Sequence, residues 1–215
     1  MHTRIPDHAN YDPRYPRFLG YEAGRLLDHA GPLEGAEVLD LACGPGKATV
    51  AALERGARNV MAVDFVHDVV DRLAAERPDI QVRAADVVDA LRSLTSRYDL
   101  IVCRQAVNYW LLDCPPELIA NRLKPGGRFV FNTINAAPPT VPASSDLQAD
   151  GRHFHDTIYR IGNRIYHVQS AEGLEPHVNF LDWIPRKQFQ SLLGPHLDLD
   201  ERVEGSASVW VCTRR

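Results

Sequence analysis

The sequence predicts an α/β fold: a doubly wound, seven-stranded, mostly parallel sheet with an antiparallel last strand, plus a small antiparallel β cap inserted after the fifth strand. Two patterns predict it. Short apolar runs alternate with helix-forming stretches up to residue 134, as in a parallel sheet with crossover helices. Beyond residue 152, short strands separated by turn residues indicate antiparallel pairing. The 215 residues are expected to form a single domain.

Residues 36–134 carry the alternating pattern. The expected strands lie at residues 38–41, 59–64, 80–84, 98–103 and 127–134. The expected helices lie at residues 47–55, 67–76, 87–95 and 115–122. Gly56 and Pro78 follow the first two helices, where such residues commonly end a helix. Right-handed crossovers should place the helices on both faces of the sheet.

The rest of the chain departs from this alternation. Residues 135–152 are rich in Ala, Pro and Ser and show no period of 2 or 3.6, which predicts a long loop, mobile or acting as a lid. Residues 153–184 indicate an antiparallel meander whose first turn is Gly162-Asn163. The other elements expected are a helix before the sheet, a late helix and a closing hairpin, at residues 18–29, 185–193, 197–203 and 208–213.

A small-residue turn follows the first strand, in the sequence VLDLACGPGK at residues 38–47. In an open parallel sheet, ligands bind beyond the carboxyl ends of the strands, where such turns lie. A phosphate-binding P-loop has four residues between its glycines, whereas one residue separates Gly44 from Gly46. Thr49 stands where a dinucleotide fingerprint has its third glycine. The turn therefore predicts a nucleotide site of another kind.

Three acidic residues lie at the ends of three successive strands. Asp40 lies inside the end of the first strand, and would repel a pyrophosphate but suit a ligand with a positive end. Asp64 ends the second strand, where a carboxylate can accept hydrogen bonds from a ribose diol, and Phe65 can lie against a purine. Asp86 follows the third strand and could accept from an adenine amino group. A nucleoside with an ammonium-bearing tail satisfies all three.

These residues resemble the class I, Rossmann-like S-adenosylmethionine-dependent methyltransferases of the small-molecule type. The segment 38–47 resembles their first motif, and Asp64 and Asp86 match their ribose and adenine acids. Residues 98–103 and 123–131 resemble their fourth strand and the turn into their fifth. One departure is an alanine, residue 42, where many relatives have glycine; Ala42 is tolerable if its φ angle is negative.

The resemblance implies S-adenosyl-L-methionine as cofactor and methyl transfer to O or N of a small-molecule metabolite. Residues 1–30 would be a helical cap, 36–134 the cofactor-binding half, 135–184 a loop and β cap, and 185–215 the last helix and hairpin. The implied cofactor-binding residues are Asp40, Ala42, Cys43, Gly44, Gly46, Asp64, Phe65, Ala85, Asp86, Val87, Arg104 and Gln105. The implied substrate-binding residues are Tyr11, Tyr15, Asn108, Tyr109, Trp110 and His153.

Some of these side chains have a simpler interpretation. Tyr11 and Tyr15 could be surface anchors for the first helix, and Tyr109 and Trp110 could be core aromatics that cap a helix. The Asn/Asp-Pro-Pro-Tyr/Phe motif of methyltransferases acting on base amino groups or glutamine is absent, which argues against those substrates.

The reaction itself needs little acid–base help, because the methyl donor is already activated. A hydroxyl or a protonated amine must still lose a proton, which a histidine or carboxylate could accept. The cluster His153-Phe154-His155-Asp156 offers His155 as a base, with Tyr109 as a second catalytic candidate. His153 and His155 could instead be a metal pair or ordinary exposed strand residues; no metal is expected. Two further histidines are weaker candidates of the same kind, His167 and His177.

Composition limits the partners. The net charge is −4 and no basic run is longer than the two C-terminal arginines, which disfavours a nucleic-acid substrate. No apolar run approaches the roughly 18 residues that span a bilayer, so no membrane partner is expected. The four cysteines lack zinc spacing and indicate reduced thiols in a cytoplasmic protein. Two rival functions stay open, a nicotinamide-dependent oxidoreductase and a non-catalytic S-adenosylmethionine-binding protein, as does the oligomeric state.

Overall fold

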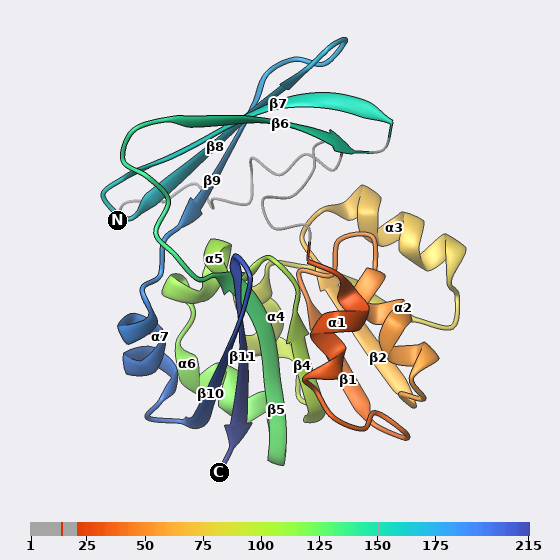
Figure 1. Cartoon of the computed structure of the whole chain (residues 1–215). Coiled ribbons are helices and arrows are strands. Elements are labelled where there is room, and N and C mark those ends of the chain that lie inside the picture. The colour runs from red at the N-terminus through yellow and green to blue at the C-terminus, as the bar shows by residue number, and fades with distance from the viewer. Residues whose placement is uncertain (1–13, 15–20, 150) are drawn as a thin grey trace.

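A computed structural model describes residues 14, 21–149 and 151–215, which form two sheets (Figure 1). The seven-stranded sheet has the order β10-β11-β5-β4-β1-β2-β3, and the four-stranded sheet has the order β6-β7-β8-β9. The strands of the first sheet are β1 (Glu37–Leu41), β2 (Asn59–Asp64), β3 (Gln81–Ala84), β4 (Tyr98–Cys103), β5 (Leu123–Ile134), β10 (Leu197–Glu204) and β11 (Ala207–Arg214). Those of the second are β6 (Ala143–Ala149), β7 (Arg152–Ile161), β8 (Arg164–Ala171) and β9 (His177–Asp182).

The direction of each strand confirms the predicted sheet. β11 pairs antiparallel with both β5 and β10, whereas the β1–β2, β1–β4, β2–β3 and β4–β5 pairs are parallel. The described helices are α1 (Ala23–Asp28), α2 (Lys47–Glu54), α3 (His67–Glu76), α4 (Val87–Ser93), α5 (Val107–Trp110), α6 (Pro116–Arg122) and α7 (Arg186–Leu193), with a 3₁₀ turn, η2, at Leu111–Asp113.

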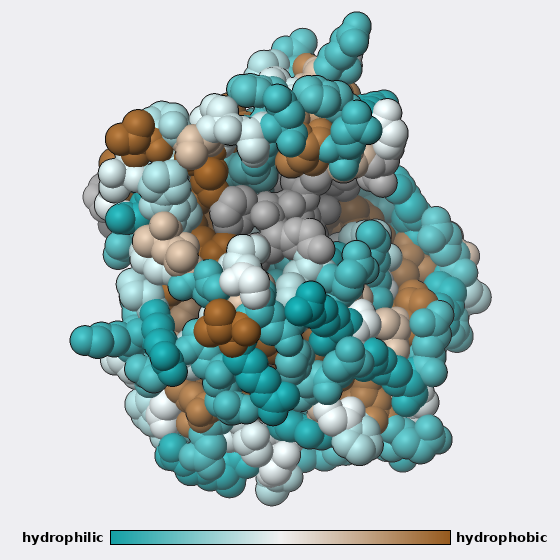
Figure 2. Space-filling model, in the orientation of Figure 1, coloured by the Kyte–Doolittle hydropathy of each residue, from teal (hydrophilic) through white to brown (hydrophobic). Residues whose placement is uncertain are grey.

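Helices cover both faces of the large sheet, as predicted. Leu100 and Val102 of β4 pack with residues of α1 and α2, while Ile101 and Cys103, which point the other way, pack with residues of α4 to α7. This alternation follows from the period-2 geometry of a strand buried on both faces. The surface is mainly hydrophilic on the side seen in Figure 2. No described helix is long and apolar enough to cross a membrane.

The prediction of a continuous loop over residues 135–152 was wrong. Residues 143–149 form β6, which pairs antiparallel along its whole length with β7. Its sequence ASSDLQA places exposed or half-exposed side chains on both faces, so it shows no hydrophobic alternation. An edge strand needs only backbone pairing on one side, which explains why the sequence pattern does not reveal it.

The four-stranded sheet is the predicted cap and lies beyond the carboxyl end of β5 (Figure 1). Ile134, the last residue of β5, packs against Ile165 of β8 and Leu181 of β9. The half-buried Tyr109 of α5 joins this apolar contact, together with Ile158. The cap is thus attached over the end of the large sheet where α/β folds bind their ligands.

Candidate functional site

Two buried carboxylates lie at the carboxyl ends of β1 and β2. Asp40 is fully buried; its Oδ2 accepts a hydrogen bond from the Thr49 hydroxyl at 2.6 Å, and its Oδ1 has no hydrogen-bond partner in the described chain. Asp64 is buried too, and its two oxygens accept from the backbone N–H groups of Gly44 at 2.8 Å and Val66 at 3.0 Å. Asp64 therefore fastens the glycine turn to the tip of the neighbouring strand.

The surroundings of Asp40 shift the pKa of its carboxyl group. Burial raises the pKa of the Asp40 carboxyl to about 7, although the Thr49 hydrogen bond and the Arg104 guanidinium both lower it. The nearby Asp64 carboxylate adds to the rise. A buried carboxylate with an oxygen lacking a partner is costly unless a cation or donor reaches it. The site thus fits a ligand that carries a positive group.

The turn between β1 and α2 uses three positive φ angles. Gly44 has φ 53° and Gly46 has φ 77°. A Cβ on Gly46 would lie 2.6 Å from the Leu73 side chain of α3, so glycine is needed there for packing as well as conformation. Ala42 has φ 55°, which overturns the expectation that its φ is negative. An L-residue in this region carries a strain of about 1–2 kcal/mol.

Replacing Ala42 by glycine should therefore raise the free energy of unfolding by roughly 1 kcal/mol or less, because relief of strain exceeds the added chain entropy of glycine. Urea unfolding of the wild type and Ala42→Gly measures the difference. The control is Ala85→Gly, at a position without a positive φ, which should lose about 0.5–1 kcal/mol. An equal decrease in the free energy of unfolding in both variants would show that the backbone at residue 42 is unstrained.

The third acid caps a helix beside the other two. Asp86 Oδ1 accepts from the backbone N–H groups of Val88 at 2.8 Å and Asp89 at 3.3 Å, at the start of α4. The Ala85 N–H donates to the Asp64 carbonyl at 2.9 Å, which keeps this turn against the tip of β2. Phe65 and Ala85 are half-buried there, and Val87 is buried. The predicted adenosine-side residues therefore gather at adjacent strand ends.

The turn after β4 holds the chain just before α1. Arg104 Nη1 and Gln105 Nε2 both donate to the Tyr21 carbonyl, at 2.7 and 3.1 Å. Gln105 has φ 61°, and its N–H donates to the Asn132 side chain of β5 at 3.0 Å. A non-glycine residue held at positive φ is common in functional turns. Arg104 and Gln105 thus join the turn after β4 to the segment before α1.

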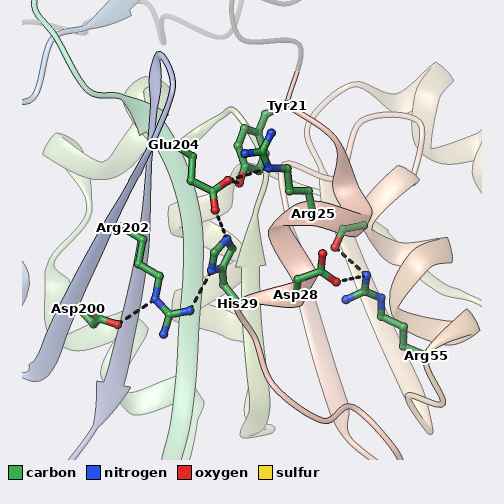
Figure 3. A network of polar contacts seen from close by, with 9 residues as sticks. Tyr21, Arg25, Asp28, His29, Arg55, Asp200, Arg202 and Glu204 are labelled. Carbon is green, nitrogen blue, oxygen red and sulfur yellow. Dashed lines mark hydrogen bonds and ion pairs between the residues drawn. The ribbon is translucent and has the colours of Figure 1, made fainter.

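Tyr21, which no sequence pattern marks, lies beside the turn after β4. Its hydroxyl donates to Glu204 Oε2 at 2.5 Å, and Glu204 also pairs with Arg25 at 2.7 Å and with His29 at 2.9 Å (Figure 3). Burial, followed by the Glu204 hydrogen bond, raises the pKa of Tyr21, so its phenol stays protonated. The network joins α1 to the β10–β11 hairpin and fixes residue 21 against the turn after β4.

Two of the predicted substrate residues, Tyr109 and Asn108, lie where the cap meets the large sheet. The Tyr109 hydroxyl accepts from Asn179 Nδ2 of the cap at 2.6 Å, so Tyr109 stands between α5 and β9. Asn108 is buried: its Nδ2 donates to the Asp182 carbonyl at 2.7 Å, and its Oδ1 accepts from the Thr133 hydroxyl at 2.7 Å. The two ends of this amide thus join the cap to β5.

Trp110 and the two leading histidines do not lie where a substrate site requires them. Trp110 is buried in the hydrophobic core next to Phe129, with ring centroids 6.2 Å apart, so the core interpretation was the right one. His153 and His155 lie on the exposed face of β7, 4.0 and 3.0 Å from Asp146. This placement contradicts His155 as base and His153 as substrate ligand. Tyr11 and Tyr15 fall outside the described residues.

No described group of three His, Cys, Asp or Glu side chains could hold a metal ion.

A different histidine lies on the buried face of the cap. His167 Nε2 is 2.5 Å from Asp156 Oδ1, and both residues are buried. The apolar partners of Asp156 along β7, Phe154 and Ile158, were the signal that this face points inward.

Part of this chain is similar in sequence to known proteins. Residues 38–127 match the family model described as a methyltransferase domain. This match lies within the parallel half of the large sheet, from β1 to the start of β5. The chain is 31% identical over 119 residues to the ubiquinone biosynthesis O-methyltransferase of Acinetobacter baylyi, covering 52% of this chain and 49% of that protein. The Xylella fastidiosa protein of the same name is 34% identical over 111 residues, covering 48% and 44%. This chain thus spans about half the length of the curated relatives it matches.

Solved structures extend the likeness over most of the chain. The S-adenosylmethionine-bound CalS10, an amino pentose methyltransferase from Micromonospora echinaspora, has a TM-score of 0.70 at 19% identity, covering 90% of this chain and 88% of that one. Streptomyces venezuelae DesVI has a TM-score of 0.69 at 17% identity, covering 90% and 91%. At these identities the likeness shows the fold, and it extends beyond the segment that matches the family model.

Proposed function

We propose that this protein transfers the methyl group of S-adenosyl-L-methionine to an O or N atom of a small molecule. The observation that carries the proposal is the gathering of Asp40, Asp64 and Asp86 at the ends of β1, β2 and β3, within the segment that matches the methyltransferase model. The unpartnered Oδ1 of buried Asp40 supports a ligand with an ammonium group. The relatives and solved neighbours named above support the same cofactor.

Each strand end would hold one part of that cofactor. Asp64 would accept from the ribose hydroxyls, since a carboxylate oxygen can take more than the one N–H that each holds now. Phe65 and Val87 would line the adenine, and Asp40 would face the ammonium. The backbone from 42 to 46 and the side chains of Arg104 and Gln105 would line the methionine part. When bound, the cofactor supplies an electrophilic methyl group on a sulfonium.

The protein's contribution would be positioning and exclusion of water. The cap is fixed over the strand ends through the Asn179–Tyr109 and Asn108–Asp182 hydrogen bonds, so it can cover a bound acceptor. Holding reacting groups in line can contribute roughly 7–11 kcal/mol in favourable cases. Tyr109, at the junction, would line the acceptor. The four cysteines are buried and form no disulfide with one another, which supports a reducing, cytoplasmic location.

Binding and turnover test this function. Calorimetric titration should show binding of S-adenosylmethionine and none of NAD, the cofactor of the rival oxidoreductase. Formation of S-adenosylhomocysteine with a panel of hydroxyl and amino metabolites should follow, which a non-catalytic binding protein would not give. Binding of NAD instead would refute the proposal. Binding of S-adenosylmethionine without turnover of any acceptor would favour the non-catalytic binding protein.

A further inference from the structure

One face of the cap sheet carries several buried polar side chains, namely Asp156, His167, Gln169 and Asn179. Ile158, His167 and Asn179 lie opposite one another on β7, β8 and β9. Residues that lie opposite each other in a sheet share a face. Asn179 on this face donates to the Tyr109 hydroxyl of α5, so His167 lies on the face that meets α5.

His167 is oriented by a carboxylate. Asp156 Oδ1 lies 2.5 Å from His167 Nε2, and the histidine side chain is 1% exposed. A carboxylate on Nε2 keeps the proton there, which puts the lone pair of the neutral ring on Nδ1. An acid that fixes the tautomer of a histidine and stabilises its protonated form is the arrangement of a general base.

Two amides on this face have unused polar atoms. Gln169 lies opposite Asp156, and Asn179 lies opposite His167. Gln169 Nε2 and Asn179 Oδ1 are both buried and have no hydrogen-bond partner in the described residues. Buried polar atoms are nearly always satisfied, so a donor and an acceptor left over on either side of one His–Asp pair indicate a ligand.

We propose that Asp156 and His167 form the base that deprotonates the methyl acceptor, and that this acceptor is a vicinal diol. The inference rests on the proposed methyl transfer. A diol fits because one hydroxyl gives its proton to the base, while the other can accept from Gln169 Nε2 and donate to Asn179 Oδ1. A neutral amine already offers a lone pair, whereas a hydroxyl must lose its proton as it attacks, so a built base favours oxygen.

The acceptor O–H bond breaks and its proton passes to His167 Nδ1, giving an imidazolium beside the Asp156 carboxylate. The oxygen lone pair forms the new bond to the methyl carbon, and the electron pair of the broken carbon–sulfur bond stays on sulfur as a neutral thioether. The imidazolium then releases its proton to solvent.

Two matched acceptor pairs test the substrate class: catechol against o-phenylenediamine, and cyclohexane-1,2-diol against cyclohexane-1,2-diamine. Methylation of at least one diol, and a lower rate with its amine counterpart, is expected. Methylation of the amines alone, or of no member of the panel by protein that binds S-adenosylmethionine, would overturn the diol assignment. Absence of S-adenosylmethionine binding would instead overturn the proposed function.

Variants test the base. His167→Gln should lower kcat with the methylated diol by about 10²–10⁴-fold, and Asp156→Asn should lower it as well, with S-adenosylmethionine affinity kept in both as a check of folding. The rise of kcat with pH that reports a basic histidine should disappear in His167→Gln, which a purely structural role would not cause. His155→Gln changes the equivalent pair on the outer face. A loss of kcat in His155→Gln, or an unchanged pH profile in His167→Gln, would refute the assignment.

Discussion

Replacing Asp64 by alanine is expected to weaken S-adenosylmethionine binding by about 1–3 kcal/mol, roughly 5- to 150-fold in Kd. Asp64 is buried at the end of β2 and holds the turn after β1 through the Gly44 N–H at 2.8 Å. The change removes both the carboxylate proposed to accept from the ribose and the anchor of the turn. Calorimetric titration measures the loss. Asp68→Ala removes the same charge from an exposed position on α3 and should leave the affinity unchanged.

The two effects of Asp64→Ala can be separated with 2′- and 3′-deoxy analogues of the cofactor. If Asp64 accepts from a ribose hydroxyl, the wild type should lose affinity for one analogue and the variant should not, because that hydrogen bond is already gone. If each deoxy analogue loses as much affinity for the variant as it does for the wild type, Asp64 acts through the turn alone. Unchanged affinity for S-adenosylmethionine in a folded variant would remove Asp64 from the site.

The parallel half could be predicted because its signals are local. β2, β4 and α3 begin and end at the predicted residues, since apolar runs bounded by turn residues specify strands without reference to the rest of the chain. The acids at strand ends were found in the same way, from position along the chain. Ala42 is the exception: its positive φ is set by the tight turn, and the sequence offers no glycine to signal it.

The cap was predicted as a meander, but its inward face was not. In β7, two sets of alternating side chains compete, with His153 and His155 on one face and Phe154 and Asp156 on the other. Period-2 alternation divides a strand into faces without saying which one is buried. That choice is made by docking against α5, through the contact of Asn179 with Tyr109, two residues 70 positions apart in the chain. The histidines that stood out in the sequence therefore lie outside.

Tertiary packing also decided the residues after β4. Asn108 and Trp110 lie in the short helix α5, where the sequence indicated a turn facing the substrate. Trp110 enters the core because α5 lies against the large sheet, and Asn108 joins two strands through its amide. Neither burial depth nor a side chain's distant partner can be read from the residues around it.

S-adenosylmethionine affinity should rise with pH between about 6 and 8, and Asp40→Asn should abolish most of that rise. Burial raises the pKa of Asp40 to about 7, so the carboxyl is largely protonated below that pH. A bound ammonium favours the ionised form, so binding below pH 7 releases a proton. Titration calorimetry in two buffers of different ionisation enthalpy measures this proton release directly. The cofactor's own amino group titrates in both proteins alike, which makes Asp40→Asn the control for it.

Stability without cofactor should change in the opposite direction. The pKa of Asp40 is about 7 in the folded protein and about 3.9 in an unfolded chain, so the folded state binds more protons between these values. The contribution of Asp40 to stability is therefore fully present below about pH 4 and is lost as the pH rises through 7, a change of the order of 4 kcal/mol. Urea unfolding of Asp40→Asn should lack this part of the slope, whereas Asp200→Asn, at an exposed position, should keep it. Identical pH slopes in Asp40→Asn and the wild type would mean that Asp40 is already ionised in the folded protein. The cofactor's ammonium would then have no proton to displace, and binding should show no proton release.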